Sequence, residues 1–239
     1  MLRSIDQVIR ILGNQKVSIE IIQKVLRSEN LSWNKFEEQA AIVISAVINP
    51  LVIPTLGLLI LLNQDTHLFF AIPDAAKWII ILLVLTNTAI LPMISIVLLK
   101  RAGIVNDVLL QERNDRIVPM LLSAVYCIAT YFLFAHLSLP GIITVNILGL
   151  AVLVILSTII TFFWKISLHM VSVGGLTGLV AALPIVLKTD SSGLLPLLFL
   201  LSGMVGTARL RLNAHNSPQV FAGFLMGFWV MYFLIIFRA

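Results

Sequence analysis

Apolar residues occur in seven long runs, which short polar segments separate. The runs cover approximately residues 40–63, 77–99, 117–136, 142–163, 168–187, 192–208 and 219–237. A helix that crosses the hydrocarbon core of a bilayer needs about 20 residues, with a range of roughly 17–25. All seven runs meet this requirement, the sixth only just, so the pattern predicts membrane-spanning helices.

The first 39 residues have a different pattern, in which charged residues alternate with Ile, Val and Leu. Helical stripes are formed by Ile5, Val8, Ile9 and Leu12, and by Ile21, Ile22, Val25 and Leu26. These stripes predict two short amphipathic helices that lie on the membrane surface or pack on the bundle. A simple polar lead-in fits the pattern equally well. We therefore divide the chain into an N-terminal amphipathic segment, 1–39, and a helical bundle, 40–239.

Composition agrees with a membrane environment. Hydrophobic residues make up 59% of the chain and charged residues only 11%, whereas soluble domains are about a quarter charged. In lipid every backbone polar group must be paired within a helix or a closed barrel. A barrel would show short alternating strands, which these unbroken runs do not. The sequence thus predicts an all-α, polytopic transmembrane helical bundle of six to seven spans.

Charge predicts the orientation of this bundle. The formal net charge of +5 would suggest nucleic acid in a soluble protein, but here the cations flank the apolar runs. Of the 16 Lys and Arg residues, thirteen lie in connections on the same side as the N-terminus. The positive-inside rule places that side in the cytoplasm. We expect a multi-pass protein, of the bacterial inner membrane, without a nucleic-acid partner.

Three polar segments interrupt the apolar pattern, at residues 111–116, 165–169 and 208–219. Two predicted spans separate the first segment from the second, and two more separate the second from the third. An even number of crossings returns the chain to the same face of the membrane. All three segments can therefore meet at one face of one bundle.

The residue types in these segments suit phosphate chemistry. Arginine binds phosphate oxygens through two parallel hydrogen bonds. Histidine can act as a nucleophile or as a general acid, and serine can donate a hydrogen bond to an oxyanion. No His, Cys and Asp residues in the segments have metal-ligand spacing, so we expect neither a metal nor another cofactor. The pattern predicts a phosphoryl-transfer site at the membrane surface.

The third segment resembles the last signature of the type 2 phosphatidic acid phosphatase superfamily. That signature is Ser-Arg, five residues, His, three residues, Asp, and here Arg209, His215 and Gln219 keep the spacing. The family's middle signature, Ser-Gly-His, is similar to the tripeptide 167–169, Ser-Leu-His. Its first signature, Lys, six residues, Arg-Pro, is matched only loosely by the segment 113–119.

The resemblance implies a role for each matched residue. His215 would be the nucleophile that forms a phosphohistidine, and His169 the general acid for the leaving group. Phosphate would be bound by Arg116, Ser167 and Arg209, with Arg113 in place of the signature lysine. The implied substrate is a lipid phosphate, either a phospholipid or a polyprenyl phosphate or diphosphate.

The sequence departs from the family at three positions, Ala208, Leu168 and Gln219. Gln219 replaces the carboxylate that orients the nucleophilic histidine. A glutamine can hold a ring tautomer, but it cannot stabilise an imidazolium by charge, and the loss of the corresponding aspartate in a protease triad lowers kcat about 10⁴-fold. We therefore expect Glu112 or Asp115 to support a histidine at the site.

Other functions fit parts of the pattern. The same pocket could bind a lipid phosphate without cleaving it, as a carrier, flippase or sensor would, and Gln219 favours this alternative. Ser167 could be an ordinary helix N-cap, and Arg113 and Arg116 could serve only topology. An intramembrane prenyltransferase would need two aspartate-rich motifs, and only the stretch 106–115 resembles one.

Overall fold

The structure is a computed structural model that describes residues 35–238 apart from 111, 138 and 191–192. Within these residues all regular secondary structure is helical. The predicted all-α bundle is therefore confirmed. The amphipathic stripes predicted before residue 35 lie outside the described residues.

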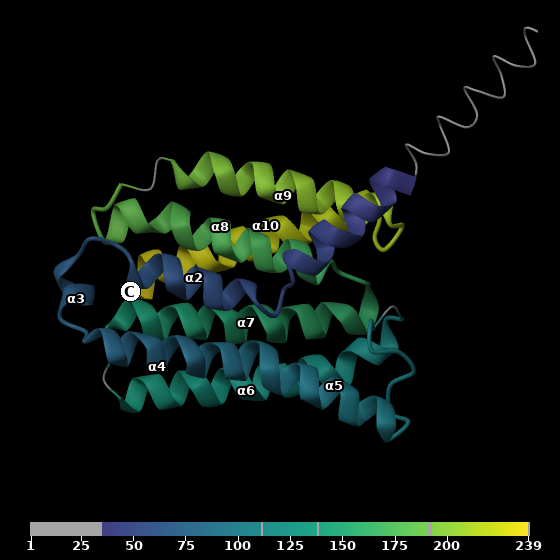
Figure 1. Ribbon diagram of the computed structural model, residues 1–239, viewed down its shortest axis with the longest axis horizontal. Coiled ribbons are helices and arrows are strands. Elements are labelled where there is room, and N and C mark those ends of the chain that lie inside the picture. Colours follow the sequence, from purple (N-terminus) through teal and green to yellow (C-terminus); the bar gives the residue numbers. More distant parts are fainter. Residues whose placement is uncertain (1–34, 111, 138, 191–192, 239) are drawn as a thin grey trace, which may run out of the picture.

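The helices succeed one another as follows (Figure 1). They are a helix over 35–47, α2 (Ile53–Leu62), α3 (His67–Phe70), α4 (Asp74–Leu85), the π-helical η1 (Thr86–Ile90), α5 (Leu91–Arg101), the 3₁₀ turn η2 (Asn114–Arg116), α6 (Ile117–His136), α7 (Gly141–Phe163), α8 (Leu168–Val186), α9 (Leu194–Arg211) and α10 (Ser217–Arg238).

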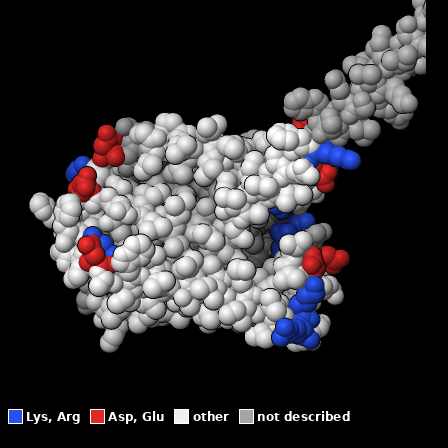
Figure 2. Space-filling model, viewed as in Figure 1, with Lys and Arg blue, Asp and Glu red and all other residues white. Residues whose placement is uncertain are grey.

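Six of the helical stretches are long and apolar enough to cross a membrane. They have 18 to 28 residues, which corresponds to roughly 27–42 Å at the rise of an α-helix. Charged side chains lie at the two ends of the face shown in Figure 2, with a broad uncharged band between them. This distribution is that of an integral, multi-pass membrane protein.

The first apolar run, predicted as one span over 40–63, is instead two helices. The helix over 35–47 ends before Asn49 and Pro50, and α2 begins at Ile53 with Pro54 in its first turn. Proline disfavours a helical conformation of the preceding residue, and the side chain of Asn49 accepts a hydrogen bond from the Leu51 N–H at 2.9 Å. Figure 1 shows the two helices in succession, so that together they cross the bundle.

Helix α8 is the most enclosed element of the bundle. Inside the protein, 67% of its most apolar stretch is buried, against 28% for α9 and for α10. It packs on α2, α7, α9 and α10, and Figure 1 shows it between α9 and α2 with α10 behind. The start of α8 therefore has a position fixed by several neighbours.

The closest helix contact joins α8 to α10 through two pairs of glycines. A Cβ at Gly174 or Gly178 of α8 would overlap the carbonyl oxygen of Phe224 or Phe228 of α10. In the reverse direction, a Cβ at Gly223 would lie 2.8 Å from the carbonyl oxygen of Ser167. Gly227 faces the Val171 carbonyl in the same way. Small residues four positions apart let membrane helices approach to backbone contact.

We expect Gly178→Ala to destabilise the protein by about 1–3 kcal/mol, because overpacking a closed contact forces the helices apart. Thermal unfolding in detergent micelles, followed by tryptophan fluorescence, measures the change. Gly203→Ala in α9 is the matched control, since nothing lies within 4 Å of a Cβ built there. Equal unfolding midpoints for the two variants would contradict the backbone contact.

Candidate functional site

The three polar segments lie at the same end of the bundle. This end holds η2 and the start of α6, the linker 164–167 between α7 and α8, and the end of α9 with its turn into α10. In Figure 2 a recess opens there, with Lys or Arg side chains at its wall. Both α8 and α10 also direct their N-termini to this end, and helix N-termini attract anions.

Arg116 is the N-cap residue of α6 and is only 7% exposed. Its Nε donates a hydrogen bond to the carbonyl oxygen of Leu110 at 2.7 Å. Leu110 has φ +51°, a left-handed conformation that is uncommon for leucine. This single bond orients the guanidinium and leaves its two terminal nitrogens without a hydrogen-bond partner among the described residues.

Ser167 occupies the N-cap position of α8 without capping it. Its backbone is extended, as N-cap residues are, but its hydroxyl makes no capping hydrogen bond. The side chain is fully buried, and Oγ has no partner among the described residues. An unpaired buried polar group costs about 1–3 kcal/mol, which makes this hydroxyl a candidate contact for a ligand.

His169 is held by the helix over 35–47. Its Nε2 lies 3.1 Å from the carbonyl oxygen of Ser45. A carbonyl oxygen can only accept a hydrogen bond, so Nε2 carries the proton and Nδ1 of the neutral ring has a free lone pair. Ser45 belongs to the last turn of its helix, where carbonyl groups lack intrahelical partners, and the imidazole satisfies one of them.

The two arginines at the end of α9 have different partners. Arg211 is exposed and forms a 2.6 Å ion pair with Glu37. Arg209 is half-buried, and its Nε has no partner among the described residues. Arg209 therefore keeps a buried donor for a ligand, while Arg211 ties α9 to the helix over 35–47.

His215 is oriented by the cap of α10. The amide oxygen of Gln219 accepts hydrogen bonds from the Asn216 N–H at 3.2 Å and from Nδ1 of His215 at 3.0 Å. The Asn216 side chain accepts in return from the Gln219 N–H at 3.1 Å, which completes a capping box. Because a backbone N–H only donates, Gln219 must present its oxygen, so Nδ1 is protonated and Nε2 has a free lone pair.

Cations surround this imidazole. Burial, and then the charges of Arg116, Arg209 and Lys165, lower the pKa of His215 to about 3, although the hydrogen bond to Gln219 acts in the opposite direction. Burial is the main cause that lowers the pKa of Lys165, and the charges of the same two arginines lower it further. Arg209 and Arg116 also interact electrostatically with His169. At neutral pH His215 is thus an uncharged base amid cations.

Three predicted site residues have other surroundings. Nη1 of Arg113 donates to the Phe163 carbonyl at 3.0 Å, at the end of α7. Both carboxylate oxygens of Asp115 accept from Asn106, at 3.0 and 3.2 Å, and Glu112 is exposed. The histidine support expected from Glu112 or Asp115 is provided for His215 by Gln219 instead, because the capping box already places this side chain against Nδ1.

Two participants were not predicted from the sequence. Lys165 contributes the third cation. Its position two residues before Ser167, in the same polar segment, is the sequence feature that could have indicated this role. The Ser45 carbonyl holds His169 from 124 positions away in the chain, and no sequence pattern marks it. Lys165, rather than Arg113, interacts electrostatically with His215.

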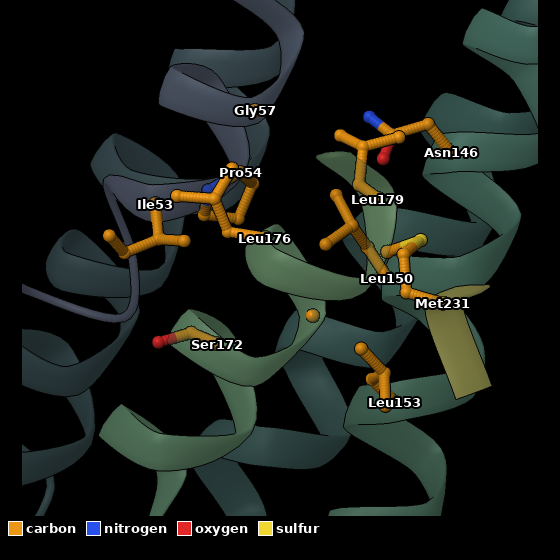
Figure 3. A pocket seen from close by; sticks show the side chains of 11 residues that line it. Ile53, Pro54, Gly57, Asn146, Leu150, Leu153, Ser172, Leu176, Leu179 and Met231 are labelled. Atoms are coloured by element: carbon orange, nitrogen blue, oxygen red, sulfur yellow. The ribbon is translucent and has the colours of Figure 1, made fainter. Parts of the chain in front are cut away.

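A small apolar cavity lies deeper in the bundle (Figure 3). It has a volume of about 30 Å³ and is lined by residues of α2, α7, α8 and α10, which is room for about one water molecule. Ser172 at one side of it donates to the His169 carbonyl. At the other side Asn146 has an amide nitrogen without a partner among the described residues. The cavity contains no charged residue, so it is separate from the cation cluster.

Arg116, Arg209 and Lys165 lie close enough to His215 for their charges to act on it, so this group of residues is a candidate site for an anion. Among the described residues, no group of three or more His, Cys, Asp or Glu could hold a metal ion.

Comparisons with protein-family models, with curated proteins and with solved structures gave no match. The family resemblance of the three polar segments stays a prediction from their residues.

We expect Gln219→Glu to raise the pKa of His215 by roughly 1–3 pH units, because an adjacent carboxylate stabilises the imidazolium. Glutamate also fits this position of a capping box, so the fold is preserved. NMR titration of histidine-labelled protein measures the change, with His215→Asn assigning the signal among the four histidines.

The matched control is Gln64→Glu, in the connection between α2 and α3 at the other end of the bundle. This control should leave the His215 titration in place. An unchanged pKa in Gln219→Glu would contradict the contact between Gln219 and Nδ1.

Proposed function

We propose that this protein is a membrane-embedded phosphatase or phosphotransferase that acts on a lipid phosphate through a phosphohistidine intermediate. One observation carries the proposal. The Nδ1–H of His215 is fixed by Gln219, so its Nε2 carries a lone pair amid the charges of Arg116, Arg209 and Lys165.

The reaction would proceed in two displacements. Nε2 of His215 attacks phosphorus, and the bond from phosphorus to the leaving oxygen breaks with its electron pair on that oxygen. Arg116, Arg209 and Ser167 stabilise the charge on the phosphoryl oxygens, as arginines do in other phosphoryl transfers. Water, or an acceptor alcohol in a transferase, then attacks the phosphohistidine, loses a proton and restores the free imidazole.

Gln219 sets the tautomer needed for attack, but it contributes no negative charge. When Nε2 is phosphorylated while Nδ1 keeps its proton, the ring becomes cationic among other cations. A carboxylate would stabilise this state by charge, whereas the Gln219 oxygen stabilises it by hydrogen bonding alone. We expect intermediate formation to be slow compared with an enzyme that has aspartate at this position.

The surroundings of the site suit an amphiphilic substrate. Arg116 is the N-cap of one spanning helix and Arg209 lies in the last turn of another, so the cations lie at the depth of lipid headgroups. The band between the bundle ends in Figure 2 has no charged side chains, and many large hydrophobic side chains of the spanning helices are exposed. A lipid can place its phosphate among the cations while its tail remains beside the helices.

A non-catalytic lipid-phosphate binder, such as a carrier or flippase, is the second candidate. The neutral side chain of Gln219 favours it, because binding requires the cations but not a stabilised imidazolium. Phosphate release by the purified protein distinguishes the two functions, and binding without release would favour the carrier.

We expect His215→Ala to lower kcat/KM for release of phosphate from a lipid phosphate by more than about 1,000-fold, because the nucleophile is removed. Arg209→Gln should lower it about 100-fold or more, because one oxyanion donor is lost. An acid-labile phosphohistidine should form in the parent protein and not in His215→Ala.

Matched controls are His136→Ala, at the opposite end of the bundle, and the exposed Arg101→Gln, at the same end. Both should retain activity. Phosphate release that persists in His215→Ala would remove the proposed nucleophile.

We also propose that the site faces the cytoplasm of a bacterial inner membrane. Most Lys and Arg residues lie in the connections at the same end of the bundle as the site, and such residues are concentrated on the cytoplasmic side. In a Cys127→Ala background, Ser217→Cys places a thiol at the exposed start of α10. An impermeant maleimide should label it in inverted vesicles and not in intact cells. His136→Cys should show the reverse, and labelling of Ser217→Cys from outside would overturn the orientation.

A further inference from the structure

We infer that the site cleaves the phosphoanhydride bond of a lipid diphosphate in preference to the ester bond of a lipid monophosphate. This inference rests on the proposed function and adds the class of bond and headgroup. It follows from which protons the site can supply, and from how many cations it contains.

The two substrate classes differ in their leaving groups. Cleavage of a monophosphate ester expels an alkoxide, which needs a proton from a general acid as it departs. Cleavage between the two phosphates of a diphosphate expels a lipid monophosphate. This leaving group is a stable anion near neutral pH, because the second pKa of a phosphate monoester is about 6, and it needs no general acid.

His169 does not have the proton that a general acid requires. The proton on Nε2 is donated to the Ser45 carbonyl, so the neutral ring exposes only the lone pair of Nδ1. A second proton would give the ring a positive charge beside Arg209 and Arg116, and like charges oppose this.

The other candidates for a general acid already take part in hydrogen bonds within the protein. The Nδ1–H of His215 is bonded to Gln219, and both carboxylate oxygens of Asp115 accept from Asn106. Arginine does not release its proton in proteins. Among the described groups of this site, only the ammonium of Lys165 is left as an acid, and a substitution described below separates its charge from its acidity.

The charge of the cluster favours a diphosphate independently. Arg116, Arg209 and Lys165 form a group of three cations, and no carboxylate among the described residues is paired with any of them. The ion pairs that the structure shows are Glu37 with Arg211 and Asp74 with Lys77. A phosphate monoester carries a charge of about −1.5 to −2, which leaves part of the cluster unneutralised, whereas the second phosphate of a diphosphate adds the missing charge.

The reaction balances without an added acid. Nε2 of His215 bonds to the terminal phosphorus, and the bond between that phosphorus and the bridging oxygen breaks. The electron pair stays on the bridging oxygen, which becomes part of the lipid monophosphate product. Water then cleaves the phosphorus–nitrogen bond and releases inorganic phosphate. Lys165 neutralises charge on the departing phosphate.

Three substrates test the inference on the purified full-length protein: dodecyl diphosphate, dodecyl phosphate and 4-nitrophenyl phosphate. The leaving groups of the first and third substrates are weakly basic anions that need no proton. The second substrate expels an alkoxide, which is strongly basic and needs one. We expect kcat/KM for dodecyl diphosphate to exceed that for dodecyl phosphate by roughly 100-fold or more, the usual contribution of a general acid. The nitrophenyl ester should also be cleaved faster than dodecyl phosphate.

Two substitutions of Lys165 separate charge from proton donation. Lys165→Arg keeps the cation but cannot release a proton, so it should lower kcat/KM for dodecyl diphosphate less than Lys165→Gln does. Lys165→Gln removes the cation and should lower kcat/KM for dodecyl diphosphate about tenfold, with a smaller effect on 4-nitrophenyl phosphate. Lys100→Gln, at the same end of the bundle, is the matched control.

Equal kcat/KM values for the two dodecyl substrates would overturn the inference and leave the proposed function intact. Loss of diphosphate hydrolysis in Lys165→Arg would overturn it too, since Lys165 would then be the acid. Failure of the proposed function is a different result, in which none of the three substrates releases phosphate and no phosphohistidine forms.

Discussion

The backbone contact between α8 and α10 is the constraint on which the rest of the site depends. Ser167 and His169 begin α8, whereas His215 and Gln219 stand at the start of α10, so the distance between these helices sets the distance between the two histidine segments. The contact extends into the site itself, because Gly223 faces the Ser167 carbonyl. Glycine is required there because any side chain would separate the two helices.

Around this fixed pair lies a group of cations and donors that no side chain in the described part of the chain neutralises. The Ser167 hydroxyl and the Arg209 Nε are buried without partners among the described residues. Burying such groups is unfavourable unless a ligand pairs with them, and this cost is part of the case for the proposed anion site. Gln219 serves both the capping box of α10 and the orientation of His215, and one oxygen atom satisfies both.

The helix over 35–47 completes the site from the N-terminal side. Its Ser45 carbonyl fixes the tautomer of His169, and Glu37 binds Arg211 at the end of α9. The break at Asn49 and Pro50 separates this helix from α2, so the helix over 35–47 need not continue along the axis of α2. The proton on His169 Nε2 is thereby bonded to a backbone carbonyl, which is the contact that the inferred preference for a diphosphate rests on.

The sequence by itself determined the helical class, the approximate spans and the common face of the three polar segments. These features depend on local hydrophobicity and on the parity of crossings, which need no knowledge of packing. Only the tertiary structure decided that Asp115 binds Asn106 and not a histidine, that Lys165 acts on His215 in place of Arg113, and that Ser45 holds His169. These pairings depend on side-chain directions and on contacts between residues far apart in the chain, which composition and spacing do not specify.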